Sequence, residues 1–428
     1  MEKLVVTGGS KLEGKIKVSG AKNAVLPIIA GSLLADGECC LQDIPQLADV
    51  NTITQVLQSI GVKVNHNTAD KELYLDARHL TGSYPPDEWV RKMRASFLVM
   101  GPLVARLGHA KISMPGGCNI GSRPIDLHLK GLTALGADIR ITHGIIEVTA
   151  NKLKGGRVYL DFPSVGATEN IMMAASLAKG TTVIENAAEE PEIVDLANFI
   201  NGMGGKVFGA GTNIIRVEGV PSLHGTTHTV IPDRVEAGTY MLMAAATGGD
   251  VLVDNVISDH LKPVMAKLAE SGVTVDEEED GIRVRSRGKW DSIDVKTLPY
   301  PGFPTDMQAQ IMAYLTIGNG TSVITETVFE NRFMHVNELR RMGANIVIEG
   351  HSAVVKGVKK LTGASVKASD LRAGAALILA GLMAEGDTKI CSIHHIDRGY
   401  EDLVTKLSGI GAKIRRIVFP DEKEVVNK

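Results

Sequence analysis

The chain has 428 residues, of which 44% are hydrophobic and 22% are charged, and its formal net charge is −3. This composition is typical of a globular protein of two or three domains, and the small net charge gives no reason to expect a nucleic acid or an anionic membrane as a partner. No apolar run approaches the ~20 residues of a membrane helix, and the start of the chain lacks the apolar core of a signal peptide, so we expect a cytoplasmic protein.

Six helices along the chain are predicted to be buried, because they are apolar on nearly every side. Residues 373–380, which contain only Gly, Ala, Leu and Ile, are an example. A helix that is apolar around its whole circumference belongs in a core. Short strands follow some of these helices, for example at 181–184, 251–253 and 322–324. In chain order, the expected buried helices cover residues 23–36, 95–107, 167–179, 236–247, 306–317 and 372–385.

A second helix in each segment ends at a glycine that marks an internal repeat. An aliphatic residue precedes the glycine by four positions, and Val or Ile follows three positions after it, as in residues 57–64. Glycine after the last helical turn adopts a left-handed conformation at little steric cost, and the Val or Ile suits a strand. The even spacing predicts six copies of one unit. The glycines are Gly61, Gly136, Gly204, Gly272, Gly343 and Gly411.

Three such repeats make a domain of ordinary size, so we expect two domains. The main boundary is placed near residues 228–232, before the fourth buried helix. The N-terminal strand, at about residues 3–20, precedes the first buried helix and is expected to close the C-terminal domain. One predicted domain therefore comprises residues 1–21 and 230–428, and the other comprises residues 22–229 and carries the first three repeats.

Cys118 differs from the other cysteines because it lies in a glycine-rich loop, residues 115–124. Such surroundings favour a reactive thiol, although a turn with an incidental cysteine remains an alternative. Cys39 and Cys391 lie in apolar strand-like segments and are expected to pack in the core. Neighbouring Cys39 and Cys40 are poorly placed for a disulfide, and no metal-ligand spacing occurs, so no metal is expected.

Polar residues gather near the starts of the buried helices, where unpaired amide groups and the helix dipole attract anions. Capping would also explain Lys22 with Asn23, and an aspartate at position 306. A solvated basic face would also explain Arg91 and Lys92. The pattern as a whole favours an enzyme that handles anionic substrates. The residues concerned are Lys22, Asn23, Arg94, Ser164, Val165, Gly166, Asp306, Asp370 and Arg372, with Arg332 and Arg398 at other unit boundaries.

At these positions the chain resembles the UDP-N-acetylglucosamine 1-carboxyvinyltransferase family, within the EPSP synthase-like superfamily. The resemblance covers essentially the whole chain, and the order and spacing of its motifs are highly specific. The motifs are residues 19–24, 93–96, the Cys118 loop, 304–308, 330–334 and 397–400.

The resemblance implies a fold of two inside-out α/β domains, each made of three pseudo-symmetric repeat units, around an interdomain cleft. It implies transfer of the enolpyruvyl group of phosphoenolpyruvate to the 3-hydroxyl of UDP-N-acetylglucosamine with release of phosphate, the first committed step of peptidoglycan precursor synthesis. No cofactor is implied, and the partners are these two small molecules. The oligomeric state is left open.

The resemblance also implies roles for individual residues. Cys118 would be the general acid and could form an adduct with the substrate, while Asp306 would be a base; Lys22 and Arg398 complete the catalytic set. Asp370 would support the site. Phosphoenolpyruvate would be bound by Lys22, Asn23, Arg94, Arg123, Arg332, Arg372 and Arg398. UDP-N-acetylglucosamine would be bound by Asn23, Arg94, Arg123, Pro124, Ile125, Asp126, Leu127, Ser164, Val165, Gly166, Asp306 and Val328.

Two positions depart from the family pattern: Ser122 stands where alanine is common, and Phe162 stands where some members have a lysine near the nucleotide phosphates. Three alternatives are weighed against the transferase. They are enolpyruvyl transfer to shikimate 3-phosphate, a regulatory paralogue that binds UDP-N-acetylglucosamine with little turnover, and a ring-like DNA clamp. The Cys118 loop and residues 123–127 argue against the first, and the intact catalytic set argues against the second. The third would need a basic inner surface, and neither the charge pattern nor any motif in the sequence supports one.

Overall fold

The computed structural model describes residues 2–114 and 125–418, which form two compact units. Among the described residues, unit 1 comprises residues 2–19 and 232–418, and unit 2 comprises residues 20–114 and 125–231. The chain passes between the units at residues 19–20 and 231–232. Each unit has a hydrophobic core of its own, and each is described by itself.

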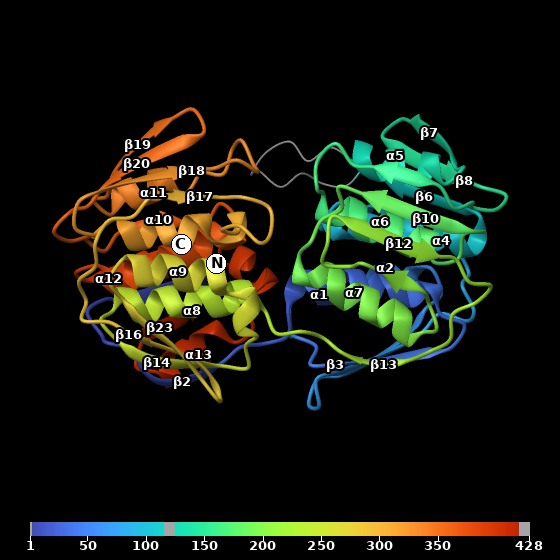
Figure 1. The fold of residues 1–428 in the computed structure, drawn as a ribbon. Coiled ribbons are helices and arrows are strands. Elements are labelled where there is room, and N and C mark those ends of the chain that lie inside the picture. Colours follow the sequence, from blue (N-terminus) through green and yellow to red (C-terminus); the bar gives the residue numbers. More distant parts are fainter. Residues whose placement is uncertain (1, 115–124, 419–428) are drawn as a thin grey trace, which may run out of the picture. The chain divides into compact units, whose positions relative to one another are not determined.

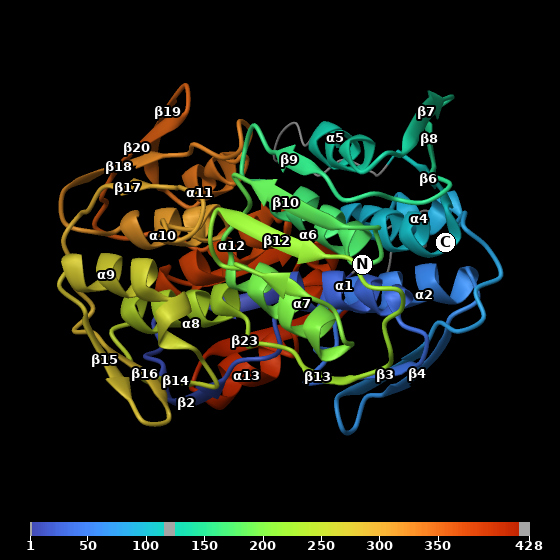
Figure 2. The same cartoon turned by 45° about the vertical axis from the view of Figure 1, so that its right-hand side comes forward.

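The core of unit 2 is made of helices (Figures 1 and 2). The segment η2–α4 contacts α6, and its first part also contacts α1. In α6 every residue from Ala167 to Ala175 is buried, including three polar ones. The helices of this unit are α1 (Lys22–Gly31) with η1 (Ser32–Leu34), α2 (Ala48–Ser59), α3 (Asp87–Val90), η2 (Arg94–Val99) with α4 (Met100–Leu107), α5 (Asp126–Ala134), α6 (Val165–Ala175) and α7 (Pro191–Gly202).

Three small sheets surround these helices in unit 2. Two of them have four strands in the same pattern. The first and second strands are parallel, the third is antiparallel to the second, and the fourth is antiparallel to the third. These sheets are β13 (Thr227–Thr229), β3 (Glu38–Gln42), β5 (Glu72–Asp76), β4 (Lys63–Asn67), and β9 (Arg157–Tyr159), β10 (Thr181–Glu185), β12 (Ile214–Glu218), β11 (Val207–Phe208). The third has the order β6 (His109–Ser113), β8 (Ile145–Thr149), β7 (Asp138–Thr142).

Unit 1 repeats the arrangement more regularly. Its inner helices α8, α10 and α12 contact one another in all three pairs, and they are buried along nearly their whole length. The outer helices bury only one side, as in α9, where Val264 and Leu268 are buried. The helices are α8 (Arg234–Ala246), η3 (Ser258–His260), α9 (Lys262–Glu270), η4 (Thr305–Met307), α10 (Gln308–Leu315), α11 (Val336–Arg341), α12 (Leu371–Met383), η5 (Ile393–Arg398) and α13 (Leu403–Gly409).

All three sheets of unit 1 have the same four-stranded pattern of one parallel pair and two antiparallel pairs. They are, in spatial order, β2 (Glu13–Lys17), β14 (Asp250–Asp254), β16 (Gly281–Arg285), β15 (Thr274–Glu278); β17 (Val295–Lys296), β18 (Thr321–Thr325), β20 (Ser352–Lys356), β19 (Asn345–Glu349); and β21 (Ser365–Lys367), β22 (Asp387–Cys391), β1 (Glu2–Thr7), β23 (Lys413–Val418).

The N-terminal strand β1 occupies an inner position in the last of these sheets. It pairs antiparallel with β22 on one side and with β23 on the other. In the other two sheets the same position is held by β16 or β20, each joined to its neighbour by a hairpin. The first residues of the chain thus complete the repeat that the last residues begin.

The six glycines that marked the repeats in the sequence all have left-handed backbone conformations. Their φ angles lie between +87° and +101°. Each follows a helix and lies shortly before the strand of its repeat. The shortest of these strands is β11, Val207–Phe208. The predicted helix ends are therefore confirmed, and the physical reason is the one the sequence suggested: a residue with a Cβ would be strained there.

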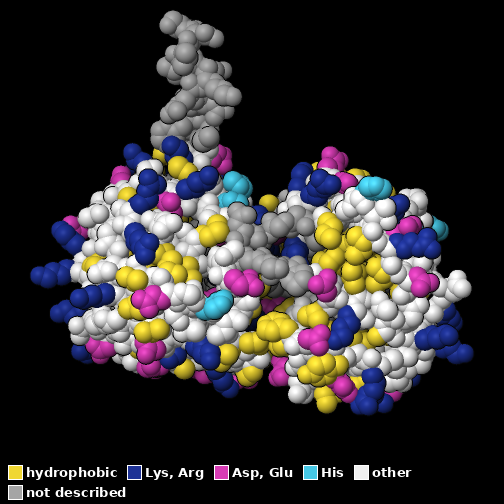
Figure 3. Space-filling model, turned by 90° about the horizontal axis from the view of Figure 1, so that it is seen from above, with side chains coloured by type: hydrophobic (Ala, Val, Ile, Leu, Met, Phe, Trp, Pro, Cys, Tyr) yellow, Lys and Arg dark blue, Asp and Glu magenta, His cyan; other side chains and the backbone are white. Residues whose placement is uncertain are grey.

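The surface of the described residues carries both signs of charge. In the view of Figure 3, lysine and arginine side chains are interspersed with aspartate and glutamate around both units. Among the helices within residues 2–114 and 125–418, none is long and apolar enough to cross a membrane.

Candidate functional site

Three charged side chains meet in unit 1, and all three were predicted to bind or act on substrate. Asp306 lies in η4, Arg332 lies between β18 and α11, and Arg372 is the second residue of α12. Arg332 Nη2 donates to Asp306 Oδ1 at 2.7 Å, and Arg372 Nη2 donates to Asp306 Oδ2 at 2.9 Å. Each arginine side chain is 5% exposed, but that of Asp306 is 25% exposed. The carboxylate is thus the accessible end of an otherwise buried ion group.

The two guanidinium groups determine the acidity of Asp306. Burial raises the pKa of this carboxyl, but the charges of Arg372 and Arg332, together with their hydrogen bonds, outweigh burial and hold its pKa well below the usual value. A carboxylate with an ordinary pKa is a weak base, so a general base of this kind needs close positioning or a raised pKa. In this state the site positions the carboxylate and lowers its pKa, so it is a weak base while both arginines bind it.

Capping does not explain Asp306. The N-cap position of η4 is Pro304, and no side chain caps that helix. By contrast, Asp370 does cap α12, since its Oδ1 accepts hydrogen bonds from the amides of Arg372 at 2.9 Å and Ala373 at 3.0 Å. Asp370 therefore fixes the first turn of α12, from which the Arg372 side chain extends.

A buried hydroxyl supports Arg372 from the other side. Arg372 Nη1 donates to the hydroxyl of Tyr400 at 3.4 Å, and that hydroxyl lies 3.0 Å from Thr239 Oγ1. Burial raises the pKa of the Tyr400 hydroxyl, although Arg372 lowers it, so Tyr400 is a neutral partner. Arg398 precedes Tyr400 by two residues, at the end of η5, and is partly exposed.

Sequence reasoning missed Glu326, which organises the same region. This carboxylate is 1% exposed. Its Oε1 accepts from Thr297 Oγ1 at 2.8 Å and from the amide of Val328 at 2.8 Å, and its Oε2 accepts from Thr305 Oγ1 at 2.9 Å. Arg332 Nη1 in turn donates to Thr305 Oγ1 at 3.0 Å. Glu326 thus positions both Val328, a predicted sugar contact, and the residue before Asp306.

In unit 2, Lys22 is held by a partner that the sequence did not reveal. Its Nζ lies 2.9 Å from Oδ2 of Asp49, in the first turn of α2, and the two side chains are 13% and 4% exposed. Lys22 begins α1, whose N-cap residue, Ala21, makes no side-chain cap. The capping interpretation of Lys22 is therefore wrong, and its ammonium group is a largely buried charge. Arg91 and Lys92, by contrast, are exposed, as a solvated basic face requires.

The predicted UDP-sugar residues of unit 2 adjoin a neutral histidine, His128. Burial lowers its pKa to about 3, with a further contribution from the charge of Arg94. Its Nδ1 lies 3.1 Å from Nδ2 of Asn170, and a Cβ built on Gly166 would come within 3.2 Å of its Cε1. Close approach explains the glycine. Ser164 caps α6 through the amide of Ala167; of the other predicted contacts, Ile125 is buried, Asp126 is exposed, and Leu127 and Val165 are partly exposed.

Unit 2 also buries a carboxylate that the sequence did not single out. Glu169, in α6, is 3% exposed. Burial raises its pKa well above the usual value, and the nearby charges of Glu192 and Glu190 raise it further. Glu169 therefore resists ionisation.

Cys118, Arg123 and Pro124 lie outside the described residues, as does Ser122. Asn23 is partly exposed in the first turn of α1. Of the other cysteines, Cys39 is fully buried, and burial raises the pKa of its thiol to about 11. Cys391 is only partly buried. Among residues 2–114 and 125–418, no group of three or more His, Cys, Asp or Glu side chains is arranged to hold a metal.

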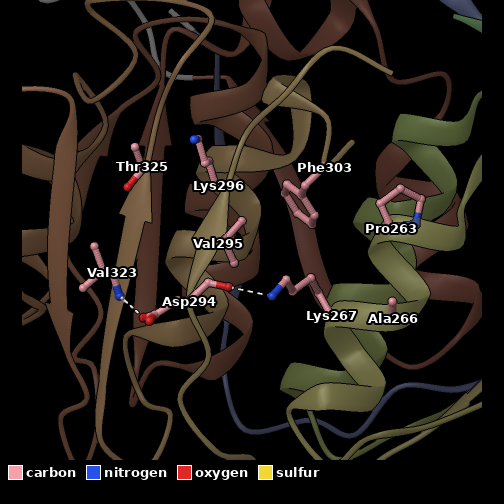
Figure 4. A pocket seen from close by; sticks show the side chains of 9 residues that line it. All are labelled: Pro263, Ala266, Lys267, Asp294, Val295, Lys296, Phe303, Val323 and Thr325. Atoms are coloured by element: carbon pink, nitrogen blue, oxygen red, sulfur yellow. Dashed lines mark hydrogen bonds between the residues drawn. The ribbon is translucent and has the colours of Figure 1, made fainter. Parts of the chain in front are cut away.

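Two cavities lie away from these clusters. One, of about 470 Å³, is in unit 1 between α9 and the strands β17 and β18. Figure 4 shows Lys267 donating to the backbone of Asp294 across it, with Phe303, three residues before Asp306, on its wall. The other, of about 910 Å³, is in unit 2 beside the ends of η1, α4 and α6.

The chain matches the family model described as EPSP synthase (3-phosphoshikimate 1-carboxyvinyltransferase) over residues 6–407. It is 62% identical over 419 residues to UDP-N-acetylglucosamine 1-carboxyvinyltransferase 2 of Carboxydothermus hydrogenoformans, covering 97% of this chain and all of that protein. It is 59% identical over 417 residues to UDP-N-acetylglucosamine 1-carboxyvinyltransferase of Halothermothrix orenii, with 97% and 100% covered.

Two solved structures are similar over nearly the whole chain. The enolpyruvyl transferase NikO from Streptomyces tendae has a TM-score of 0.89 at 24% identity and covers 98% of this chain and 99% of its own. EPSP synthase from Acinetobacter baumannii has a TM-score of 0.77 at 19% identity and covers 98% and 100%. At such identities the likeness establishes the fold alone, and it confirms the predicted class of inside-out α/β units built from repeats.

Proposed function

The chain belongs to the EPSP synthase family, and within it to the UDP-N-acetylglucosamine 1-carboxyvinyltransferases, and from this premise we propose that it transfers the enolpyruvyl group of phosphoenolpyruvate to the 3-hydroxyl of UDP-N-acetylglucosamine. The observation that carries the proposal is the 62% identity to a relative of that name along its entire length. The buried cations Arg332 and Arg372 and the largely buried Lys22 support it, since the substrates are anions. The product would be the first committed precursor of peptidoglycan.

The reaction adds an alcohol across a double bond and then eliminates phosphate. A proton moves to the methylene carbon of phosphoenolpyruvate, and the sugar 3-hydroxyl oxygen bonds to the adjacent carbon. The resulting ketal loses a methyl proton as the bond between carbon and phosphate oxygen breaks. We assign the first proton to Cys118, and the uptake of the hydroxyl or methyl proton to Asp306. Each requires a group held at hydrogen-bonding distance.

The ion group of unit 1 suggests how Asp306 becomes a base. A carboxylate or phosphate of the substrate that binds Arg332 and Arg372 competes with Asp306 for their N–H groups, since both arginines donate to Asp306. Planar guanidinium groups bind such oxyanions well. Once these bonds pass to the substrate, the pKa of Asp306 rises, because the charges that lowered it are then shared. Binding of the anion thus prepares the base.

The cations of unit 2 have the complementary task of holding substrate anions. Asp49 keeps Lys22 in place through an ion pair. Arg94 lies close enough to His128 for its positive charge to help burial keep that imidazole neutral, so the histidine adds no second cation there. We assign phosphoenolpyruvate to Lys22, Asn23, Arg94, Arg123, Arg332, Arg372 and Arg398. We assign the UDP-sugar to Asn23, Arg94, Arg123–Leu127, Ser164–Gly166, Asp306 and Val328.

The test is phosphate release from phosphoenolpyruvate with and without UDP-N-acetylglucosamine, together with mass analysis of the sugar product. The expected result is release that depends on the UDP-sugar, with a product heavier by one enolpyruvyl group. Shikimate 3-phosphate in place of the UDP-sugar should give no release. UDP-sugar binding by calorimetry without any release would contradict the proposal and indicate the regulatory paralogue instead.

A further inference from the structure

A buried charged network in unit 1 contains none of the residues predicted to bind or act on substrate. Lys406, in α13, places its Nζ 2.6 Å from Ser19 Oγ and 2.7 Å from Glu236 Oε1. Ser19 Oγ lies 2.6 Å from Oε2 of Glu401, and the Ser19 amide donates to Glu236 Oε2 at 2.9 Å. Ser19 and Glu401 are 6% and 7% exposed, and the side chains of Lys406 and Glu236 are 18% and 3% exposed.

The direction of the bonds in this network follows from the chemistry. A lysine ammonium can only donate, so Ser19 Oγ accepts from Lys406. The single hydroxyl proton of Ser19 is then available for Glu401, which accepts it. Lys406 therefore acts on Glu401 through Ser19, and it acts on Glu236 directly. Ser19 is also the last residue of unit 1 before the chain passes into unit 2.

Such a network is costly to bury, and stability alone does not account for it. Buried ion pairs often contribute no net stability relative to apolar residues of the same size. Here one ammonium faces two carboxylates, and burial raises the pKa of Glu236, although Lys406 lowers it. A purely apolar contact among α8, α13 and the segment around Ser19 would avoid this cost. The place of the network, one residue from Tyr400 in the chain, points to a positional role.

The network adjoins the candidate site through consecutive residues. Glu401 follows Tyr400, whose hydroxyl accepts from Arg372 at 3.4 Å. Arg372 in turn donates to Asp306. Arg398 lies three residues before Glu401 in the same short segment. A displacement of the Glu401 backbone therefore moves both the tyrosine that supports Arg372 and the loop that carries Arg398.

We propose that Lys406 is a positioning residue for enolpyruvyl transfer: through Ser19 and Glu401 it holds the segment Arg398–Glu401 so that Tyr400 and Arg398 keep their places beside the substrate anion. The inference rests on the proposed function for its substrates. Among the described residues, Lys406 bonds to Ser19 and Glu236, neither of which is a predicted substrate residue, so its effect passes through the segment that it anchors.

The experiment compares Lys406→Met and Lys406→Arg with the wild-type protein, using phosphate release at varied phosphoenolpyruvate and varied UDP-N-acetylglucosamine. Lys406→Met should lower kcat/KM for phosphoenolpyruvate about tenfold or more, while affinity for the UDP-sugar, measured by calorimetry, stays within about twofold. Lys406→Arg retains the charge and the donors, so it should restore most of the loss. The matched control is Lys360→Met, which removes an exposed lysine paired with Glu385 and should leave all constants unchanged.

Loss of kcat/KM to the same extent in Lys406→Met and Lys406→Arg, with lowered melting temperature in both, would overturn the proposal in favour of a packing role. Unchanged kinetics in Lys406→Met would also overturn it. If Lys406→Met does not fold, Ser19→Ala decides the question, because it removes the bridging hydroxyl and leaves both charges present. The expected result is weaker phosphoenolpyruvate kinetics at unchanged circular dichroism, and kinetics equal to wild type would refute the role.

Failure of the proposed function would be visible separately, as absence of UDP-sugar-dependent release in the wild-type protein. In that case calorimetric titration with phosphoenolpyruvate alone replaces the kinetic comparison. Weaker binding by Lys406→Met, restored in Lys406→Arg, would still support the positioning role. Equal binding of phosphoenolpyruvate by the wild type and both variants would refute the positioning role.

Discussion

Asp306 competes with the substrate for two arginines, and this predicts a split effect on the kinetic constants. In Asp306→Asn the neutral amide is a weaker competitor for Arg332 and Arg372, so phosphoenolpyruvate should bind more tightly. Turnover should fall by roughly 10²-fold or more, because a general base contributes about 10²–10⁴-fold to a rate. Steady-state phosphate release should therefore show a lower KM for phosphoenolpyruvate and a much lower kcat.

The control for this variant is Asp370→Asn, which removes a nearby carboxylate charge but retains an acceptor for the cap of α12. Its kcat should remain close to that of the wild type. A raised KM together with unchanged kcat in Asp306→Asn would contradict both the base assignment and the competition.

The buried carboxyl group of Glu169 predicts a pH dependence of stability. The pKa of Glu169 is higher in the folded protein than in the unfolded chain. The protonated side chain therefore contributes its full stability below the unfolded pKa, and this contribution is lost as pH rises through the folded pKa. Between these two values the slope is about 1.4 kcal/mol per pH unit. Glu169→Gln has no carboxyl group to ionise, so it avoids the cost of burying a charge at high pH. The free energy of unfolding by urea, measured for the variant minus the wild type, should therefore be larger at about pH 8 than at about pH 5.5.

Glu88→Gln, at an exposed position in the same unit, is the matched control and should show no such difference between the two pH values. If Glu169→Gln gained the same stability at both pH values, ionisation of the carboxyl group would not be the cause of that gain.

At the residue scale, sequence reasoning found the charged side chains but not their partners. Asp306, Arg332 and Arg372 were all predicted as site residues, and the structure brings them together. Asp49 and Glu326 were missed, because a buried aspartate or glutamate looks like any surface acid until the fold shows what it bonds. Whether Cys118 acts as predicted stays a prediction.

At the scale of single elements, the cap of α12 predicts a loss that combines stability with substrate binding. Asp370→Ala removes two hydrogen bonds to the first turn, which should lower stability by about 1 kcal/mol. Because Arg372 projects from that turn, KM for phosphoenolpyruvate should also rise. Thermal unfolding and phosphate release measure the two effects on the same sample. Asp370→Asn should show neither, and a stability loss without any change in KM would separate the cap from the site.

The helices were predictable because their signals are local. An all-round apolar pattern identified the buried helices, and the glycine after each outer helix identified its end. The breaks were not predictable: η2 covers Arg94–Val99 before α4 begins, and η4 covers Thr305–Met307 before α10. Asp306 in η4 belongs to the ion group with Arg332 and Arg372, and the charge of Arg94 in η2 acts on His128. Neither the residue pattern nor helix propensity carries a signal for a tighter first turn.

At the scale of the whole molecule, the pairing of β1 with β23 predicts a tolerated rearrangement of the chain. Glu2 lies opposite Val418 in an antiparallel ladder, so a turn of about two to five residues can join them. This joint would recreate the hairpin that β15–β16 and β19–β20 form in the other sheets. A permutant with that joint, opened at the exposed turn between Glu279 and Asp280, should fold and retain activity within a few-fold of the wild type.

A permutant with the same joint but opened between Val323 and Ile324, inside β18, should not fold, because that cut divides a strand paired on both sides. Circular dichroism and thermal unfolding distinguish the two. If the first permutant also failed to fold, the connection between β15 and β16, which it opens, would matter more than the joint between β23 and β1.

The position of β1 in its sheet determines when this strand can form its hydrogen bonds during synthesis. The partners of β1 are β22 and β23, which follow all the other described strands in the chain. At about 5–20 residues per second, the apolar strand waits on the order of a minute for them. The described strands of unit 2 have all been made once Thr229 is reached, so that unit can fold while unit 1 is still being translated. During that interval the backbone groups and the buried side chains of β1 lack the partners that they have in the finished sheet.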